Sequence, residues 1–347
     1  MMNSRGRDRR AKRHASKLSR DRSDGPFDGE RVPGNLTMPT EISVILATYN
    51  RADSLKITLA SFRGLSIPSR LSWELLVVDN NSKDATREVI ESFAKAASFT
   101  VRYVLEKIQG RSAALNAGIR VAQGDIVAFT DDDVILHPDW LSSLKNTFDR
   151  FDCAAVAGRV VPSWNQPKPD WLEMKDQQAV VNFDLGDQYK EIRYPPLGAN
   201  SAFRKEVFAK YGLFRLDLGV RGSKHTITCD DTEFGDRLVR AGEKIVYDPQ
   251  AIIYHPVSPE RTTRKYFLTW YYYNGVSLTR TAGLPDAGVF YFGVPRWLFR
   301  ELAENFCKWM FSLNGQRFQH RLHTYRSIGT IIESYRLSRL AVGRQDV

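Results

Sequence analysis

Residues 126–133 read Ile-Val-Ala-Phe-Thr-Asp-Asp-Asp, an apolar run that ends in three adjacent carboxylates. A Gly-Asp pair at 124–125 precedes the run and Pro138 follows it, and both are turn signals. A continuous apolar run of this length is typical of a strand that is buried on both faces of an α/β sheet. Open α/β sheets bind ligands beyond the carboxyl ends of their strands, so we expect the three acids to lie at a binding edge.

Three adjacent acids repel one another unless a cation neutralises them. A hard divalent cation with oxygen ligands, Mg²⁺ or Mn²⁺, is the simplest solution, and such an ion usually brings a phosphate group with it. The alternative is a solvated acidic turn. The apolar strand in front makes that alternative less favourable, because it holds the acids at the edge of the sheet.

Strands and helices alternate along the chain before this run. Repeated βαβ units require a parallel sheet with right-handed crossovers, and the carboxyl ends of its strands then share one rim. We therefore expect Thr48, Asp79 and Asp131, which follow three of these strands, to gather at that rim. The four expected strands are Ile42–Ala47, Trp73–Val78, Val101–Leu105 and 126–130.

The chain beyond the three acids is less regular. A strand is expected over Ala154–Val161, and residues 162–197 hold several prolines without a clear period. A long loop in a compact domain is usually functional, so this one is a candidate lid or acceptor wall. Two short strands are expected over Ile245–Tyr247 and Ala251–Tyr254, and His255 follows the second. A lone histidine is more often structural, but this one follows an apolar strand as the acids do, so both interpretations stand.

A second acidic cluster, Asp230–Asp231–Thr232–Glu233, opens a helix that Gly242 closes. Carboxylates at a helix N-terminus are favoured by the helix dipole, so capping alone accounts for one of them. Capping does not account for three acids in four positions. Like charges this close raise one another's pKa, a useful property for a group that accepts a proton.

Composition and charge bound the remaining possibilities. The chain has 347 residues, is 42% hydrophobic and 26% charged, and carries a formal net charge of +10, so an ample core is expected. Three separated cysteines do not support a zinc site and suggest a reducing compartment. Neither a signal peptide nor a bilayer-spanning run is visible, which favours a cytoplasmic protein.

The excess positive charge lies at the two ends of the chain. Residues 1–40 contain 10 Lys or Arg against 5 acids, and residues 261–347 contain 13 against 5. We expect 1–40 to be a disordered basic tail, because it has almost no apolar residues. Basic ends on a slightly acidic body indicate an anionic partner, either a membrane surface or nucleic acid.

Six segments in this order resemble the family 2 glycosyltransferases of GT-A fold. The match covers about residues 42–256, and its strength lies in the order and spacing of the motifs together. The matching segments are Ser43–Arg51, Val77–Ser82, Gly110–Gly118, Phe129–Asp133, Gly198–Asn200 and Asp230–Glu233.

The resemblance implies an α/β fold with a Rossmann-like, mostly parallel sheet flanked by helices, and a role for each matching residue. Asp231 takes the position of the catalytic base, and Asp230 stands where the family usually has Glu, a longer side chain of the same charge. The implied donor-binding residues are Thr48, Tyr49, Asn50, Arg51, Asp79, Arg111, Asn116, Asp131 and Asp132. The implied acceptor-binding residues are Gly198, Ala199, Asn200 and Asp230, and the implied ligands of Mg²⁺ or Mn²⁺ are Asp131, Asp133 and His255.

The implied reaction inverts the sugar's anomeric centre. An acceptor hydroxyl attacks the donor sugar while one base takes its proton, and a metal ion neutralises the charge that grows on the departing diphosphate. A UDP-sugar is the expected donor, and a glycan or lipid-linked sugar is the expected acceptor. Processive members carry a QxxRW motif, which the comparable stretch 264–270 lacks. We therefore expect one sugar to be added per encounter.

We expect a catalytic domain over 41–256 and a helical, aromatic-rich extension over 257–347. In that extension Val294, Leu298, Leu302, Phe306, Met310 and Leu313 fall on one face of a helix. Such a face can lie in a membrane interface, which would make the protein peripheral on the cytoplasmic side, or it can pack on the catalytic domain. Both remain open, and the oligomeric state is not predicted.

Two rival functions remain. A sugar-nucleotide nucleotidylyltransferase would need a Gly-rich phosphate loop after the first strand, where Thr48–Arg51 has no glycine. A non-catalytic protein that binds nucleic acid or membrane through its basic ends would not need the acidic rim. Nucleic acid is therefore the less favoured partner, and binding that falls with salt and needs neither nucleotide nor metal would indicate it.

Overall fold

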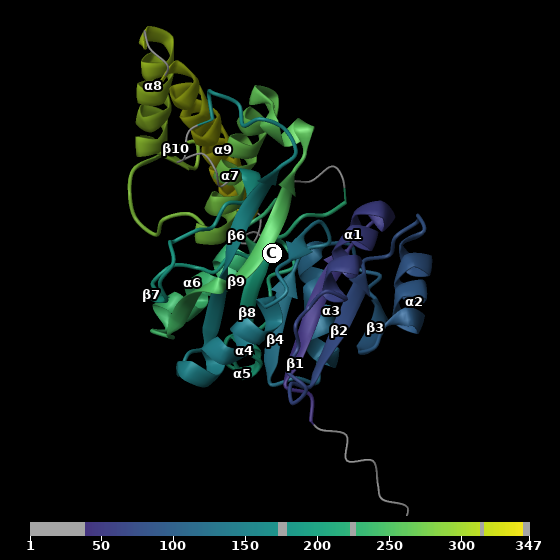
Figure 1. Cartoon of the computed structure of the whole chain (residues 1–347). Helices are drawn as coiled ribbons and strands as arrows, with labels where there is room; N and C mark the ends of the chain where they lie inside the picture. The colour runs from purple at the N-terminus through teal and green to yellow at the C-terminus, as the bar shows by residue number, and fades with distance from the viewer. Residues whose placement is uncertain (1–38, 173–178, 223–226, 313–315, 343–347) are drawn as a thin grey trace, which may run out of the picture. The chain divides into compact units, whose positions relative to one another are not determined.

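The apolar segments of the chain form one large mixed sheet. The computed structural model describes residues 39–172, 179–222, 227–312 and 316–342, so the expected tail over 1–40 lies almost wholly outside the described part. Within the described residues the sheet has nine strands, in the order β3-β2-β1-β4-β8-β6-β9-β5, with β7 paired to β9 (Figure 1). Residues 39–347 form one compact unit, and a functional boundary at 256 stays a prediction.

One half of the sheet is parallel, as the alternation of strands and helices predicts. Strand β1 pairs in parallel with β2 on one side and with β4 on the other, and β3 adds to β2. The strand order reverses beside β1, and ligands bind at such a switch point in open α/β sheets. The four strands are β1 (Ile42–Thr48), β2 (Trp73–Asp79), β3 (Thr100–Leu105) and β4 (Ile126–Thr130).

The other half of the sheet is mixed. Strand β8 (Asn200–Arg204) runs antiparallel to both β4 and β6 (Ala155–Trp164). Strands β5 (Ile135–Leu136) and β7 (Lys190–Ile192) pair antiparallel with β9 (Ile245–Val257), which runs parallel to β6.

The two short strands expected within 245–254 are in fact one strand. Gly158 of β6 pairs with Asp248, and the next residue, Arg159, pairs with Ile252. The register between β6 and β9 therefore shifts at this point, and the residues between Asp248 and Ile252 have no partner on β6. The sequence pattern indicated a break between two strands here, but β9 continues through it.

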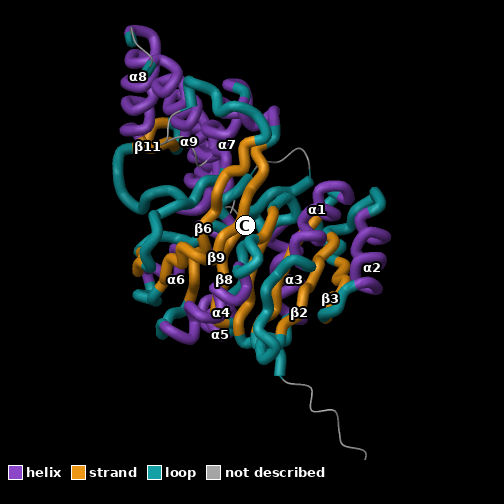
Figure 2. Tube along the Cα trace, viewed as in Figure 1, coloured by secondary structure: helices purple, strands orange, loops and turns teal. Residues whose placement is uncertain are grey.

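Helices cover both faces of the sheet (Figure 2). Alternate residues of β1 face opposite sides: Val44 packs in one core with Leu55 and Ile90, and Ile45 in a second core with Phe234. Each large apolar side chain that is fully buried contributes about 1.5–3 kcal/mol. The helices are α1 (Ala52–Phe62), α2 (Thr86–Ala96), α3 (Arg111–Val121), α4 (Trp140–Arg150), α5 (Glu206–Tyr211) and α6 (Asp230–Arg240).

The C-terminal region is helical, as expected. A short 3₁₀ helix, η2 (Pro259–Thr262), leads into α7 (Arg264–Ala282). A two-stranded hairpin of β10 (Phe290–Tyr291) and β11 (Val294–Pro295) then precedes α8 (Arg296–Phe311) and α9 (Arg317–Val342). Helix α9 packs against both α7 and α8 (Figure 1).

The apolar face expected along 294–313 is divided in the structure. Val294 belongs to β11, and Leu298 is buried at the start of α8. Phe306 and Met310 are 45% and 47% exposed, because α8 turns only part of its apolar surface toward α9. Leu313 lies outside the described residues. In the described part of the chain, no helix is both long and apolar enough to cross a bilayer.

Candidate active site

The three carboxylates after β4 point in different directions. Asp132 is buried, with its side chain only 7% exposed, whereas the side chains of Asp131 and Asp133 are 30% and 21% exposed. The middle acid is therefore turned into the protein and its two neighbours toward the rim. Strand β4 ends at Thr130, and Asp132 and Asp133 belong to the turn that follows it, so the turn sets these directions.

Asp131, Asp133 and His255 lie close enough to share one cation. One ligand atom of each lies within 4.8 Å of the others. Two carboxylates and an imidazole suit Mn²⁺ and leave positions free for phosphate oxygens, as Mg²⁺ and Mn²⁺ sites usually do. The metal-ligating set expected from sequence is thus brought together by β4 and β9, which lie apart in the sheet.

The orientation of the His255 ring also suits a ligand. His255 is buried, and its Nδ1 lies 3.1 Å from the carbonyl oxygen of Pro256. A carbonyl oxygen only accepts, so Nδ1 is the ring nitrogen that donates there, and Nε2 is the one left to face a cation. That Nε2 lies 3.4 Å from Asp133 Oδ1. The residues therefore fit a divalent ion in the type and the spacing of their ligand atoms.

Positive side chains surround Asp133 and Asp132. Arg51 Nη1 donates to Asp132 Oδ1 at 2.7 Å and to Asp133 Oδ2 at 2.9 Å, and Arg261 Nη2 lies 3.6 Å from Asp133 Oδ2. Burial works against the charge of Asp133, but His255, Arg51 and Arg261 together hold its pKa below the ordinary value. Burial, with repulsion from Asp133, raises the pKa of Asp132 to about 6, although Arg51 opposes the rise.

The loop after β1 supports this arrangement. Thr48 Oγ1 donates to Asp132 Oδ2 at 2.7 Å, so its hydroxyl orients the buried acid. Asn50 has a φ of 51°, a conformation that asparagine tolerates better than most residues. Its backbone N–H donates to Ser82 Oγ and its Oδ1 accepts from the N–H of Lys83, which ties the β1 and β2 loops together. Tyr49, which lies between Thr48 and Asn50 in the chain, is half-buried.

Asp79 is held at the end of β2 by two donors. Its Oδ1 accepts from the N–H of Ser82 at 2.8 Å, and its Oδ2 accepts from the hydroxyl of Tyr103 on β3 at 2.9 Å. Burial and the charge of Asp79 raise the pKa of Tyr103 to about 12, so this hydroxyl stays a donor at neutral pH. Tyr103 fixes the orientation of Asp79, and the sequence reading did not single it out.

A half-buried arginine joins the acids after β4 to the acids of α6. Arg111 Nη1 donates to Asp230 Oδ2 at 2.7 Å, and its Nη2 donates to Asp131 Oδ1 at 3.1 Å. The two acidic groups lie 97 or more residues apart in the chain, yet one guanidinium bridges them. They therefore line a single site.

Asp230 and Asp231 differ in whether a positive side chain pairs with them. Arg111 neutralises Asp230 directly, whereas Asp231 has no arginine within ion-pair distance among the described residues. Burial, followed by repulsion from Asp230, raises the pKa of Asp231 despite the nearby Arg111. A carboxylate with a raised pKa binds a proton more readily, which suits Asp231 to the role of a proton acceptor.

The orientation of Asp231 is fixed by backbone donors. Its Oδ2 accepts from the N–H of Gly198 at 2.7 Å, and its Oδ1 accepts from the N–H of Thr232 at 2.7 Å. A Cβ on Gly198 would lie 2.8 Å from Arg111 Nη2 and 2.9 Å from Asp231 Oδ2. Only glycine lets the backbone approach this closely, so position 198 in the loop before β8 has to be glycine for its N–H to reach Asp231.

Three predicted binding residues are buried and make their contacts within the protein. Asn116 donates through Nδ2 to Phe214 O and accepts through Oδ1 from Phe214 N, so it anchors the loop after α5. Asn200 is fully buried, where it accepts from Trp140 Nε1 and donates to two backbone carbonyls. Ala199 is also buried. Their contacts with donor or acceptor stay predictions.

Comparison with known proteins identifies the family and the fold of this chain. The family model for glycosyl transferase family 2 matches residues 43–212, which contain Thr48, Asp79, Arg111 and the three acids after β4. The chain belongs to glycosyl transferase family 2. It is therefore a glycosyltransferase enzyme.

Two relatives of this glycosyltransferase are named for glucuronosyl transfer and for succinoglycan biosynthesis. It is 28% identical over 249 residues to a glucosyl-dolichyl phosphate glucuronosyltransferase of Haloferax volcanii, a match that covers 68% of this chain and 76% of the relative. It is 29% identical over 230 residues to the succinoglycan biosynthesis protein ExoM of Rhizobium meliloti, covering 65% and 71%.

Solved structures confirm the GT-A glycosyltransferase fold. The glycosyltransferase superimposes on the mannosyltransferase PcManGT of Pyrobaculum calidifontis, which was solved with GDP-Man and Mn²⁺, with a TM-score of 0.51 and 17% identity. That match covers 89% of this chain and 76% of the other. TarS of S. aureus matches with a TM-score of 0.50 and 16% identity, over 87% of this chain and 55% of the other.

Sequence reasoning missed two further residues of the glycosyltransferase site. Arg261 lies in η2, in a stretch without a recognisable motif, and reaches Asp133 only because β9 delivers it to the rim. Asn80 donates to the carbonyls of Glu106 and Ile108 and accepts from the N–H of Gly110, so it holds the loop that leads to Arg111. Its position directly after β2 was the available signal.

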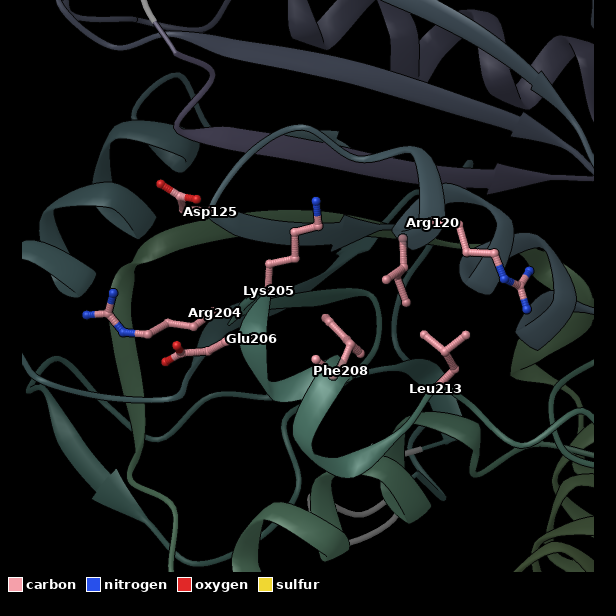
Figure 3. Close-up of a pocket in the computed structure, with 9 residues that line it drawn as sticks. Arg120, Asp125, Arg204, Lys205, Glu206, Phe208 and Leu213 are labelled. Atoms are coloured by element: carbon pink, nitrogen blue, oxygen red, sulfur yellow. The ribbon is translucent and has the colours of Figure 1, made fainter. Parts of the chain in front are cut away.

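A separate hollow of about 690 Å³ lies at the other end of the strands (Figure 3). Its lining includes Asp125, which precedes β4, and Lys205, which follows β8. Because β8 runs antiparallel to β4, the end of β8 lies beside the start of β4, away from the acids. This hollow is therefore not part of the candidate active site of the glycosyltransferase.

Proposed function

We propose that this glycosyltransferase transfers a sugar from a nucleotide-sugar donor, a UDP-sugar, to a hydroxyl group of a glycan or lipid-linked acceptor. The anomeric centre is inverted, Mg²⁺ or Mn²⁺ is required, and Asp231 is the general base. The observation that carries the proposal is the bridge through Arg111, which joins the group of Asp131, Asp133 and His255 to the pair of Asp230 and Asp231.

The residues divide the work of the reaction. Asp131, Asp133 and His255 would hold the ion, which when bound neutralises the charge that develops on the leaving diphosphate. Arg51 and Arg261 lie against Asp133, so their positive charge stands beside the place where a diphosphate would meet the ion. Donors placed in advance at a developing charge are usually the largest single contribution to catalysis.

Asp231 would accept the proton of the acceptor hydroxyl. Its pKa is raised, and it has backbone donors on both carboxylate oxygens, which keep the group aimed in one direction. Arg111 prevents Asp230 from competing for the proton, because it pairs with that carboxylate. General-base help of this kind is worth about 10²–10⁴ in rate.

The acceptor class is proposed from the relatives and the composition. The Haloferax volcanii relative is named for a lipid-linked sugar, glucosyl-dolichyl phosphate, and ExoM for the synthesis of a polysaccharide. The basic C-terminal region would place the enzyme at the cytoplasmic face of a membrane, as a peripheral protein, where a lipid-linked acceptor is presented. The stretch 264–270 lacks the QxxRW motif of processive members, so the product should be one sugar longer than the acceptor. Mass spectrometry of the product can measure this difference.

A thermal-shift panel tests the donor and the metal together. UDP-, GDP- and dTDP-sugars are added to the protein with Mn²⁺ or with a chelator, and only a ligand of the folded state raises the unfolding midpoint. We expect a UDP-sugar to stabilise the protein, and only with Mn²⁺. A ligand at about 100 times its Kd should add about 2.7 kcal/mol.

Asp133→Ala is the matching variant. It removes one of the three ligands and should abolish the Mn²⁺-dependent part of the shift. Asp149→Ala, at an exposed site on α4, is the control and should behave as the wild type. Equal donor shifts with and without Mn²⁺ in the wild type would refute the metal assignment.

A further inference from the structure

The hairpin between α7 and α8 ends in a strained aromatic residue. Tyr291 pairs with Val294, so Phe292 and Gly293 form a two-residue turn, with φ values of 52° and 77°. Turns of this kind strongly favour Asn-Gly, and a bulky side chain at positive φ is a genuine outlier. Phe292 is also 87% exposed, so within the chain its ring gains almost no packing to offset the strain.

The position of this turn is fixed by the helices behind it. A Cβ on Gly293 would lie 2.2 Å from Ser338 Oγ, so the turn rests directly on α9. Strand β11 contacts both α8 and α9. The hairpin is therefore held in place by packing while its tip carries an aromatic ring into solvent. Observed strain of this type is a legitimate starting point for an inference about function.

Exposed apolar side chains continue from the hairpin along α8. The ring of Tyr291 lies 6.5 Å from that of Phe299, and Phe306 and Met310 follow Phe299 at helical spacing on the same face. Contiguous exposed apolar surface marks a site of interaction with a protein or a membrane. We call the following residues the aromatic surface: Val289, Phe290, Tyr291, Phe292, Phe306, Met310 and Phe311, all of which are at least 36% exposed.

Cations without partners border the aromatic surface. Arg296 directly follows β11, and Arg339 directly follows Ser338, the residue against which the turn rests. Both arginines are exposed, and among the described residues neither forms an ion pair. Residues 261–347 carry 13 Lys or Arg against 5 acids, so the charge of the whole region has the same sign.

We propose that the aromatic surface docks the protein on an anionic lipid bilayer, with the ring of Phe292 inserted at headgroup depth. Aromatic rings are favoured at that depth, and arginines beside them meet anionic headgroups. An anionic bilayer thus offers an apolar environment for the exposed rings and negative charge for the unpaired arginines. A protein partner would have to supply an acid matched to each arginine. The inference deepens the peripheral location stated under the proposed function and does not depend on the reaction.

Phe292→Asn separates docking from folding. Asparagine before glycine is the preferred sequence for this turn, so the variant should fold at least as stably as the wild type. Its binding to vesicles that contain phosphatidylglycerol should nevertheless fall about five- to tenfold in sedimentation assays, because the inserted ring is lost. Ile57→Gln is the matched control: Ile57 is 60% exposed on α1, and its loss should leave vesicle binding unchanged.

The double variant Arg296→Gln with Arg339→Gln tests the charge. It should weaken binding to phosphatidylglycerol vesicles by at least about fivefold and reduce the salt dependence of binding. Vesicles of phosphatidylcholine alone should bind the wild type more weakly than those with phosphatidylglycerol.

Two results would overturn the proposal. One is Phe292→Asn binding vesicles as the wild type does. The other is a wild type whose self-association, measured by light scattering, is lost in Phe292→Asn while vesicle binding persists, which would make the surface an interface between copies. Donor binding in the thermal-shift panel needs no vesicles, so failure of docking and failure of the proposed reaction are told apart.

Discussion

Replacing Asp231 with asparagine should separate donor binding from sugar transfer. The substitution keeps the volume of the side chain and removes its ability to accept a proton. Both oxygens of Asp231 accept from backbone N–H groups, those of Gly198 and Thr232. In the variant one of these donors meets an amide NH₂ and loses its partner, which costs about 1–3 kcal/mol of folding free energy.

The expected loss of activity is larger than the loss of stability. A general base contributes about 10²–10⁴ in rate, so kcat should fall by that factor, or about 3–5 kcal/mol of barrier. The Kd of the donor with Mn²⁺ should stay within about twofold, because Asp231 is not one of the three residues that share the cation site. Release of the nucleotide diphosphate in the presence of acceptor measures kcat. Calorimetry measures the Kd of the donor.

The pH profile provides a second readout. A base works only when deprotonated, so kcat/KM of the wild type should rise with pH through the pKa of Asp231 and then level off. That pKa lies above the ordinary carboxyl value, because burial and Asp230 raise it. The rising limb should therefore appear at a higher pH than for an ordinary aspartate, and Asp231→Asn should lose it.

Asp236→Asn, on the same helix and partly exposed, is the control and should keep near-normal kcat. A kcat for Asp231→Asn above about one tenth of the wild-type value would fall below the smallest effect expected of a general base and would refute the assignment. An equal loss in donor affinity would refute the division of roles between Asp231 and the metal group.

Two further predictions concern the packing of the C-terminal helices. Glu333 on α9 is buried and accepts from Arg280 on α7 at 2.7 Å, so Glu333→Gln should lower the free energy of unfolding by about 2 kcal/mol. Gly329 lies where a Cβ would be 2.1 Å from the carbonyl oxygen of Tyr272, so Gly329→Ala should cost about 1–3 kcal/mol by forcing α7 and α9 apart. Denaturant unfolding measures both, with Gly64→Ala as the neutral control, since its nearest atom would lie at 3.5 Å.

The pH dependence of the Glu333 effect has a definite sign. Burial opposes its charge, but Arg336 and Arg280 hold its pKa below the ordinary value. Stability from a depressed carboxyl pKa is present above the unfolded-state pKa and is lost as pH falls through the folded-state pKa. The difference in the free energy of unfolding between the wild type and Glu333→Gln should thus shrink as the pH falls. A difference that stays constant with pH would contradict the ion-pair explanation.

Local sequence patterns predicted the parallel half of the sheet and the rim at its carboxyl ends. Apolar runs of strand length alternate there with helical periods, and a right-handed crossover leaves only one way to stack such units. Thr48, Asp79 and Asp131 therefore had to follow strands that end on the same side. The grouping of Asp131, Asp133 and His255 was implied only by the resemblance to the family, because the strand pattern left the role of His255 open.

The tertiary structure alone decided how these side chains are paired. The antiparallel insertion of β8, the continuous β9 and the bridge of Arg111 between Asp131 and Asp230 all join segments far apart in the chain. A period of 2 or 3.6 residues encodes which face of a segment is buried but not which distant segment covers it. The same limit applies to Phe292, whose strain and exposure arise from the packing of its turn on α9.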